Sequence, residues 1–168
     1  VVDLDGRTLQ PFQTTGEFID KTVKVLDKVN PDYARQLTLM NNSGLLDLEN
    51  RKGKAPGGYN TSLSDLGSSF IFMNHVKLHN DVVTLLHESG HAFHGFECFN
   101  LPYYHQRNSP MEFNEVASMA MELLAAPYLL EDEGGFYDQQ DYARARIQHL
   151  EKIVLFWPYM AVVDAFQH

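Results

Sequence analysis

The sequence predicts a mainly α-helical domain of the α-rich α+β class, with a small antiparallel β-hairpin or sheet. Apolar residues recur at helical spacing behind recognisable helix starts along most of the chain, whereas only 59–63 and 69–74 have strand character. The 168 residues are 44% hydrophobic and contain no internal repeat, so we expect one domain, 1–168, with its own core.

The N-terminal part of the sequence predicts a pair of helices. Thr14 and Glu17 form a capping box before a helical apolar pattern that reaches Val29. The Asn-Pro pair at 30–31 ends this helix and starts a short second one. The segment 41–58 is rich in Asn, Gly, Lys and Pro, and it therefore predicts a loop.

The two strand candidates lie on either side of a turn that contains Ser, Asp and Gly, so we expect them to pair as a hairpin. A third helix, from about 82 to 94, should follow. Asn80 and Asp81 can cap its start, and Gly95 offers an exit.

This third helix carries the run His87-Glu88-Ser89-Gly90-His91. Positions i and i+4 lie one above the other on a helix, so His87 and His91 can direct ring nitrogens at one metal ion. Glu88 lies about 100° round the axis, near the open position of that metal. The pattern predicts a zinc site with a glutamate base beside it.

A hydrolytic zinc site needs three protein ligands and one open position for water, so a third donor must come from elsewhere. The candidates for this third ligand are His94, Glu97, His105, Glu112, Glu115 and Glu122. Three ligands on one straight helix would splay around its axis, and we therefore interpret His94 as a packing or supporting residue.

A fourth predicted helix, which starts near Pro110, supplies the favoured donor. Ser109 as N-cap, Pro110 at the first position and Glu112 at the third form a capping box, which gives Glu112 a backbone role. Glu115 then lies in the second turn, where a packed helix would hold it rigidly; without the histidine pair it would be an ordinary solvated glutamate. The expected buried stripe comprises Val116, Ala117, Ala120, Leu123 and Leu124.

Glu122 follows Glu115 by seven residues and has mostly apolar neighbours. A glutamate in such surroundings needs a partner, and a metal-binding histidine needs its second ring nitrogen held. We therefore predict that Glu122 supports a ligand histidine, with simple exposure on the outer side of the helix as the alternative.

The C-terminal part predicts an acidic turn at 131–135 and then a long helix from about 138 to 157. Pro158 should kink or end this helix. Its expected core face comprises Ala143, Ile147, Leu150, Val154 and Trp157.

The active-site region resembles the thimet oligopeptidase and oligoendopeptidase F family of zinc metallopeptidases. The resemblance rests on the runs 86–94 (LHESGHAFH) and 113–118 (FNEVAS), and it extends to 53–59, 70–74 and 157–159. It implies a zincin-like helical catalytic core that acts on oligopeptides. One Zn²⁺ per chain would be bound by His87, His91 and Glu115, with Glu88 as the catalytic base.

In zinc peptidases of this type a strand edge lines the cleft, so the resemblance implies substrate contacts from Gly57, Gly58 and Tyr59. A peptide can add to such an edge through main-chain hydrogen bonds. An ordinary turn-flanked hairpin is the alternative interpretation.

The ends of the chain suggest a catalytic-core fragment of a larger metallopeptidase. The chain opens on Val1, and the apolar segment 161–168 has no helix stop. In the family that this sequence resembles, tyrosine and histidine groups that stabilise the reaction intermediate come from a loop well beyond the third ligand. The corresponding positions would lie beyond His168. The remainder of the parent enzyme would then complete the cleft. We interpret Tyr103, Tyr104 and His105 as local packing residues.

Composition narrows the function class. A formal net charge of −9 argues against nucleic acid and anionic membranes as partners, and the apolar run 153–163 is too short to span a bilayer. Cys98 is the only cysteine, which favours a reducing, cytoplasmic compartment and excludes a structural site built on several cysteines. Two alternatives to an endopeptidase stay open: a catalytically inert zinc-binding fragment and a zinc aminopeptidase.

Overall fold

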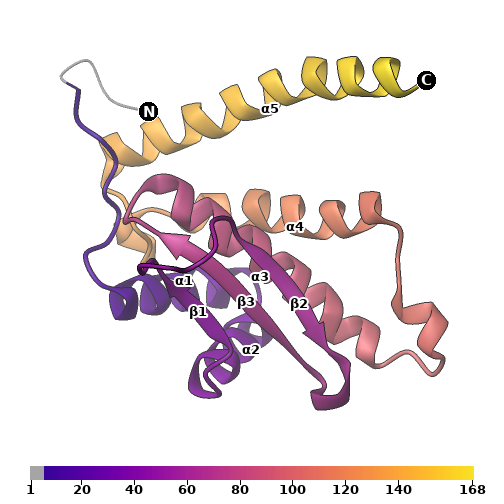
Figure 1. Cartoon of the computed structure of the whole chain (residues 1–168). Helices are drawn as coiled ribbons and strands as arrows, with labels where there is room; N and C mark the ends of the chain where they lie inside the picture. The colour runs from indigo at the N-terminus through magenta and orange to yellow at the C-terminus, as the bar shows by residue number, and fades with distance from the viewer. Residues whose placement is uncertain (1–5) are drawn as a thin grey trace.

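The computed structural model describes residues 6–168, and it confirms the α-rich α+β class. A small sheet lies at one side of the molecule, and α1, α2 and α3 lie behind it in the view of Figure 1. Helix α4 packs along α3, and α5 runs past α4, farther from the sheet. The core includes Phe18, Leu26, Leu37, Ile71 and Leu85, all essentially inaccessible to solvent.

The helix pair at the N-terminus is as predicted: α1 spans Thr15–Val29 and α2 spans Pro31–Asn42. Thr14 caps α1 by accepting a hydrogen bond from the Glu17 backbone at 3.1 Å. The Glu17 carboxylate reaches back to the backbone N–H of Gln13 at 2.8 Å, one residue before the position expected for a capping box.

The sheet has three strands: β1 is Leu46–Glu49, β2 is Tyr59–Leu63 and β3 is Ser68–His75. The β2–β3 hairpin is confirmed as antiparallel, but β1 pairs parallel to β3 inside the segment predicted to be a loop. That prediction was wrong because β1 is short and forms only through pairing with a distant strand and burial of Leu48. The order β1-β3-β2 leaves β2 at the edge.

Helix α3 spans His79–Phe99 and is longer at both ends than predicted. Its N-cap is Leu78. Asp81 accepts hydrogen bonds from the backbone N–H groups of Val76 and Leu78 at 2.9 and 2.8 Å, so it stabilises the helix start from inside the first turn. Gly95 does not end the helix.

Helix α4 spans Met111–Ala125, and both its cap and its buried face differ from the prediction. Ser109 donates to the Asn114 side chain at 2.5 Å instead of capping the helix. The side that packs on α3 buries the small or polar Ser118 and Glu122 with Met121 and Ala125. The expected stripe residues Val116, Leu123 and Leu124 are 62%, 51% and 52% exposed.

Helix α5 spans Gln139–Gln167 and continues through Pro158. Of the two predicted effects of Pro158, a kink or the end of the helix, the second is therefore wrong. Its expected core face was also wrong. Ile147, Leu150, Val154 and Trp157 are more than half exposed, whereas Ala145 is buried. Within 6–168, no helix is long and apolar enough to cross a membrane.

Candidate metal centre

His87, His91 and Glu115 lie together between α3 and α4. One ligand atom from each residue lies within 4.8 Å of the others. The Nε2 atom of His87 is 3.2 Å from Glu115 Oε2, and the Nε2 atom of His91 is 3.6 Å from Glu115 Oε1. Two imidazole nitrogens from α3 and the Glu115 carboxylate from α4 therefore converge on one point.

Both histidines have a further hydrogen-bond partner. The Nδ1 atom of His87 hydrogen-bonds Glu122 Oε1 at 2.7 Å, and Glu122 is only 7% exposed. The backbone of Asn114 acts as a hydrogen-bond partner of His91. The His87 ring is thus fixed with Nε2 facing Glu115, which is the arrangement that metal-binding histidines need.

Burial and neighbouring charges set the protonation of these groups. Burial lowers the pKa of His91, whereas for His87 the opposing hydrogen bond and charge of Glu122 outweigh burial and raise its pKa. Burial raises the pKa of Glu88, and the negative charge of Glu115 adds to the rise. A backbone hydrogen bond from Asn60 and the charge of His87 act in the opposite direction.

Gly90, in the middle of the histidine motif, allows α3 and α4 to approach closely. A Cβ atom at this position would lie 2.7 Å from both the Ala117 carbonyl oxygen and the Ser118 Cα atom. Both contacts are with backbone, which cannot move aside as a flexible side chain could. The missing side chain of Gly90 therefore lets α4 bring Glu115 to the two histidines.

Gly90→Ala should destabilise the fold by roughly 2–3 kcal/mol, the upper part of the range for overpacking a core. Gly16→Ala is the matched control, because this helical glycine has nothing within 4 Å of its Cβ position and alanine is the better helix former. Urea denaturation of both variants measures the difference. Equal stability of the two variants would contradict the close-contact role of Gly90.

A cleft of about 590 Å³ opens over the three residues and the Glu88 side chain. Residues 59–62 of strand β2 and the preceding Gly58 form one wall, and Asn60 contacts Glu88 through its backbone. Gly58 and Tyr59 lie in this wall, but Gly57 is not among the lining residues. A Cβ at Gly58 would meet Thr84 of α3 at 3.2 Å, so internal packing already accounts for this glycine.

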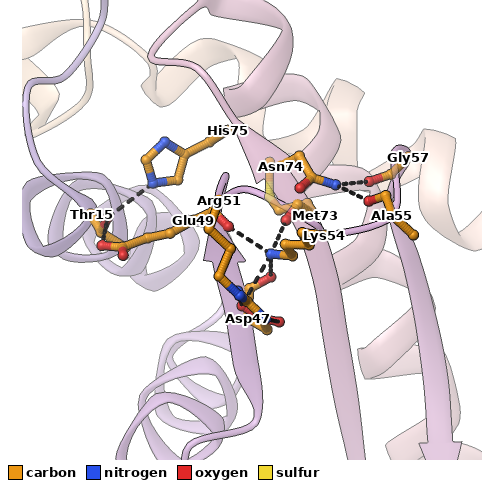
Figure 2. Close-up of polar contacts among 10 residues, drawn as sticks. All are labelled: Thr15, Asp47, Glu49, Arg51, Lys54, Ala55, Gly57, Met73, Asn74 and His75. Atoms are coloured by element: carbon orange, nitrogen blue, oxygen red, sulfur yellow. Dashed lines mark hydrogen bonds and ion pairs between the residues drawn. The ribbon is translucent and has the colours of Figure 1, made fainter.

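The loop before β2 is fastened to the sheet by two side chains (Figure 2). Lys54, whose side chain is 1% exposed, donates to Asp47 Oδ1 and to backbone carbonyls that include Met73 of β3. Asn74 donates to the carbonyl oxygens of Ala55 and Gly57 at 2.7 and 3.0 Å. These bonds fix the position at which β2 enters the cleft wall.

Lys54→Met should cost about 3 kcal/mol of unfolding free energy, because the buried ammonium group is lost and the Met73 carbonyl oxygen is left without this donor. The Asp47 and Glu49 carbonyl oxygens also lose this donor. Lys52→Met is the control, since Lys52 is exposed and should change stability by less than about 0.5 kcal/mol. Chemical denaturation compares the two variants, and similar denaturation midpoints would argue against a stabilising role for the Lys54 hydrogen bonds.

Other residues considered from sequence lie outside the three-residue cluster. His94 lines the cleft, whereas Glu97, Glu112 and His105 are exposed. Tyr103 and Tyr104 are 61% and 70% exposed and do not line the cleft. The Asn114 backbone contact and the place of Arg107 in the cleft wall were not predicted from the sequence, because no residue pattern indicates a backbone partner before the fold is known.

Comparison with known proteins gives one family. Residues 4–168 match the sequence profile of Peptidase family M3. The chain is 33% identical over 111 residues to an oligoendopeptidase F homolog of Mycoplasma genitalium, covering 65% of this chain and 18% of that protein. It is 32% identical over 123 residues to oligopeptidase PepF of Bacillus subtilis, covering 71% and 18%.

The fold is also similar to that of a solved enzyme, PZ peptidase A with an inhibitor. The TM-score is 0.85 at 30% sequence identity, over 98% of this chain and 28% of that chain. The chain therefore spans about a fifth of the length of the curated relatives and about a quarter of the solved structure.

Proposed function

Since this chain belongs to peptidase family M3, we propose that it forms the zinc-dependent catalytic core of an endopeptidase that hydrolyses oligopeptides. The observation that carries the proposal is the convergence of His87, His91 and Glu115 within 4.8 Å, on the floor of a cleft beside buried Glu88. The names of the relatives, oligoendopeptidase F and oligopeptidase, support oligopeptides as the substrate class.

The donor set fits zinc. Two imidazole nitrogens and one carboxylate are a ligand set of catalytic zinc sites, which leave a fourth position open. When bound, zinc would lower the pKa of a water molecule toward about 7 and polarise the scissile carbonyl. Glu122 would hold the His87 ring in the tautomer that presents Nε2, and the Asn114 backbone would help to hold His91.

Glu88 would act as the general base and then as the general acid. It would accept the proton of the attacking water and pass it to the departing amine. Its burial favours this exchange because a carboxylate with a raised pKa holds a proton more readily than an exposed one. The Asn60 backbone contact would keep the carboxylate directed along the cleft.

The outer edge of β2 would bind the substrate main chain. The strand is at the edge of the sheet, and residues 58–62 line the cleft. A peptide in extended conformation could pair with this edge through main-chain hydrogen bonds, which do not depend on its side chains. Gly58 and Tyr59 keep their proposed contact role, and Gly57 would contribute by shaping the turn before them, at φ 101°.

The remainder of a larger protein would cover the apolar surface of α5. Leu155, Trp157 and Val162 are 68–73% exposed, and apolar side chains gathered on a protein surface mark an interaction site. The relatives extend well beyond the matched region. We expect this surface, together with the second wall of the cleft, to be completed by that remainder.

An internally quenched oligopeptide with an acetylated N-terminus tests the function. Cleavage that stops with a chelator and returns with Zn²⁺ supports the endopeptidase; cleavage restricted to the unblocked peptide indicates an aminopeptidase. Zinc bound without turnover would indicate an inert zinc-binding fragment. Absence of zinc binding would refute the metal centre.

A further inference from the structure

Glu122 has a second oxygen that the support of His87 does not use. Its Oε1 atom accepts from His87, while Oε2 faces α5, with His149 Nε2 at 3.6 Å and Lys152 Nζ at 3.9 Å. The side chains of Glu122 and His149 are only 7% and 13% exposed. One buried carboxylate therefore stands between the candidate metal centre and a different helix.

An apolar cavity lies between helix α5 and the α4 surface near Glu122. The helix is anchored near its start, where Ala145 is buried and Asp141 pairs with Arg7 at 2.6 Å. Farther along, a cavity of about 560 Å³ separates it from α4 and is also lined by His87, Glu122 and His149. His149 and Lys152 of α5 thus approach Glu122, and Glu122 in turn contacts His87 of the candidate metal centre.

From this geometry we infer that His149 is a positioning residue that acts through Glu122, so that docking of α5 and zinc binding strengthen each other. This inference rests on the proposed metal centre. A buried carboxylate keeps its rotamer when both oxygens have donors. The Nε2–H group of a neutral imidazole is a sufficient donor for Oε2, and a small side-chain rotation would bring it from 3.6 Å to hydrogen-bond distance.

The coupling must act in both directions. If α5 fixes Glu122, and Glu122 fixes His87, then the helix raises zinc affinity. By linkage, zinc must stabilise the docked helix by the same factor. Lys152, which is more exposed, adds a positive charge to the same oxygen but is less firmly placed.

Zinc affinity of the full chain, measured by competition with a chromophoric chelator, tests the inference. His149→Leu should weaken Zn²⁺ binding by about tenfold, the lower end of the range for lost outer-shell partners. His149→Gln retains a donor near the Nε2 position and should remain within about threefold of wild type. His168→Leu is the control, because His168 is exposed at the end of α5.

A double-mutant cycle separates positioning from general packing. If His149 acts through Glu122, His149→Leu should have little further effect in a Glu122→Gln background. In the wild type, Zn²⁺ should also slow hydrogen exchange of the α5 amides, and Glu122→Gln should remove that protection. An equal loss of affinity in both backgrounds, or an unchanged affinity of His149→Leu, would overturn the inference. A wild-type chain that binds no zinc would instead refute the proposed metal centre.

Discussion

Glu88→Gln is expected to reduce peptide hydrolysis by about 10³-fold while zinc content stays at the wild-type level. Removing a general base typically costs 10²- to 10⁴-fold, and here the same group would serve both proton transfers. Glutamine has nearly the same shape but cannot accept the proton of the attacking water. Because Glu88 is not among the three clustered ligand atoms, the metal should remain bound.

Turnover of the quenched peptide and zinc per chain should be measured on the same preparations. Glu112→Gln is the matched control: it makes the same chemical change at an exposed position of α4 and should leave both quantities unchanged. Normal activity of Glu88→Gln would remove Glu88 from its role. Joint loss of zinc and activity would mean that Glu88 helps to hold the metal.

The features that the sequence predicted correctly depend on local rules. The start of α1 follows from Thr14, and the pairing of β2 with β3 follows from two strand-like runs around a short turn. The placement of His87 and His91 on one face follows from the period of a helix. Each of these depends on residues that are close in sequence, which explains why no knowledge of the fold was needed.

The features that were mispredicted depend on distant partners. Strand β1 exists because β3 and the core accept it. Helix α4 has apolar residues on most sides, so its pattern could not show that the face with Ser118 would pack on α3 near Gly90. Helix α5 buries Ala145 alone and leaves its larger apolar residues exposed, because the partners that its pattern indicates are not among residues 6–168.

Glu115→Ala is expected to weaken zinc binding by more than about 100-fold, beyond the loss typical of a partner that only supports a ligand. The carboxylate is the only donor that α4 would contribute, and its oxygens lie 3.2 and 3.6 Å from the two imidazole nitrogens. Without it, two histidines on one helix would hold the metal alone. Chelator competition and zinc content after dialysis measure the effect.

Hydrolysis by Glu115→Ala should fall together with zinc content and recover in part when excess Zn²⁺ is supplied, because Glu88 and the β2 edge remain in place. This recovery distinguishes it from Glu88→Gln, which excess Zn²⁺ should not rescue. Glu97→Ala provides the control, since Glu97 is an exposed glutamate of α3 outside the cluster. If Glu115→Ala kept its zinc after dialysis, the third ligand would have to be another residue, and the convergence of α3 and α4 would need a different explanation.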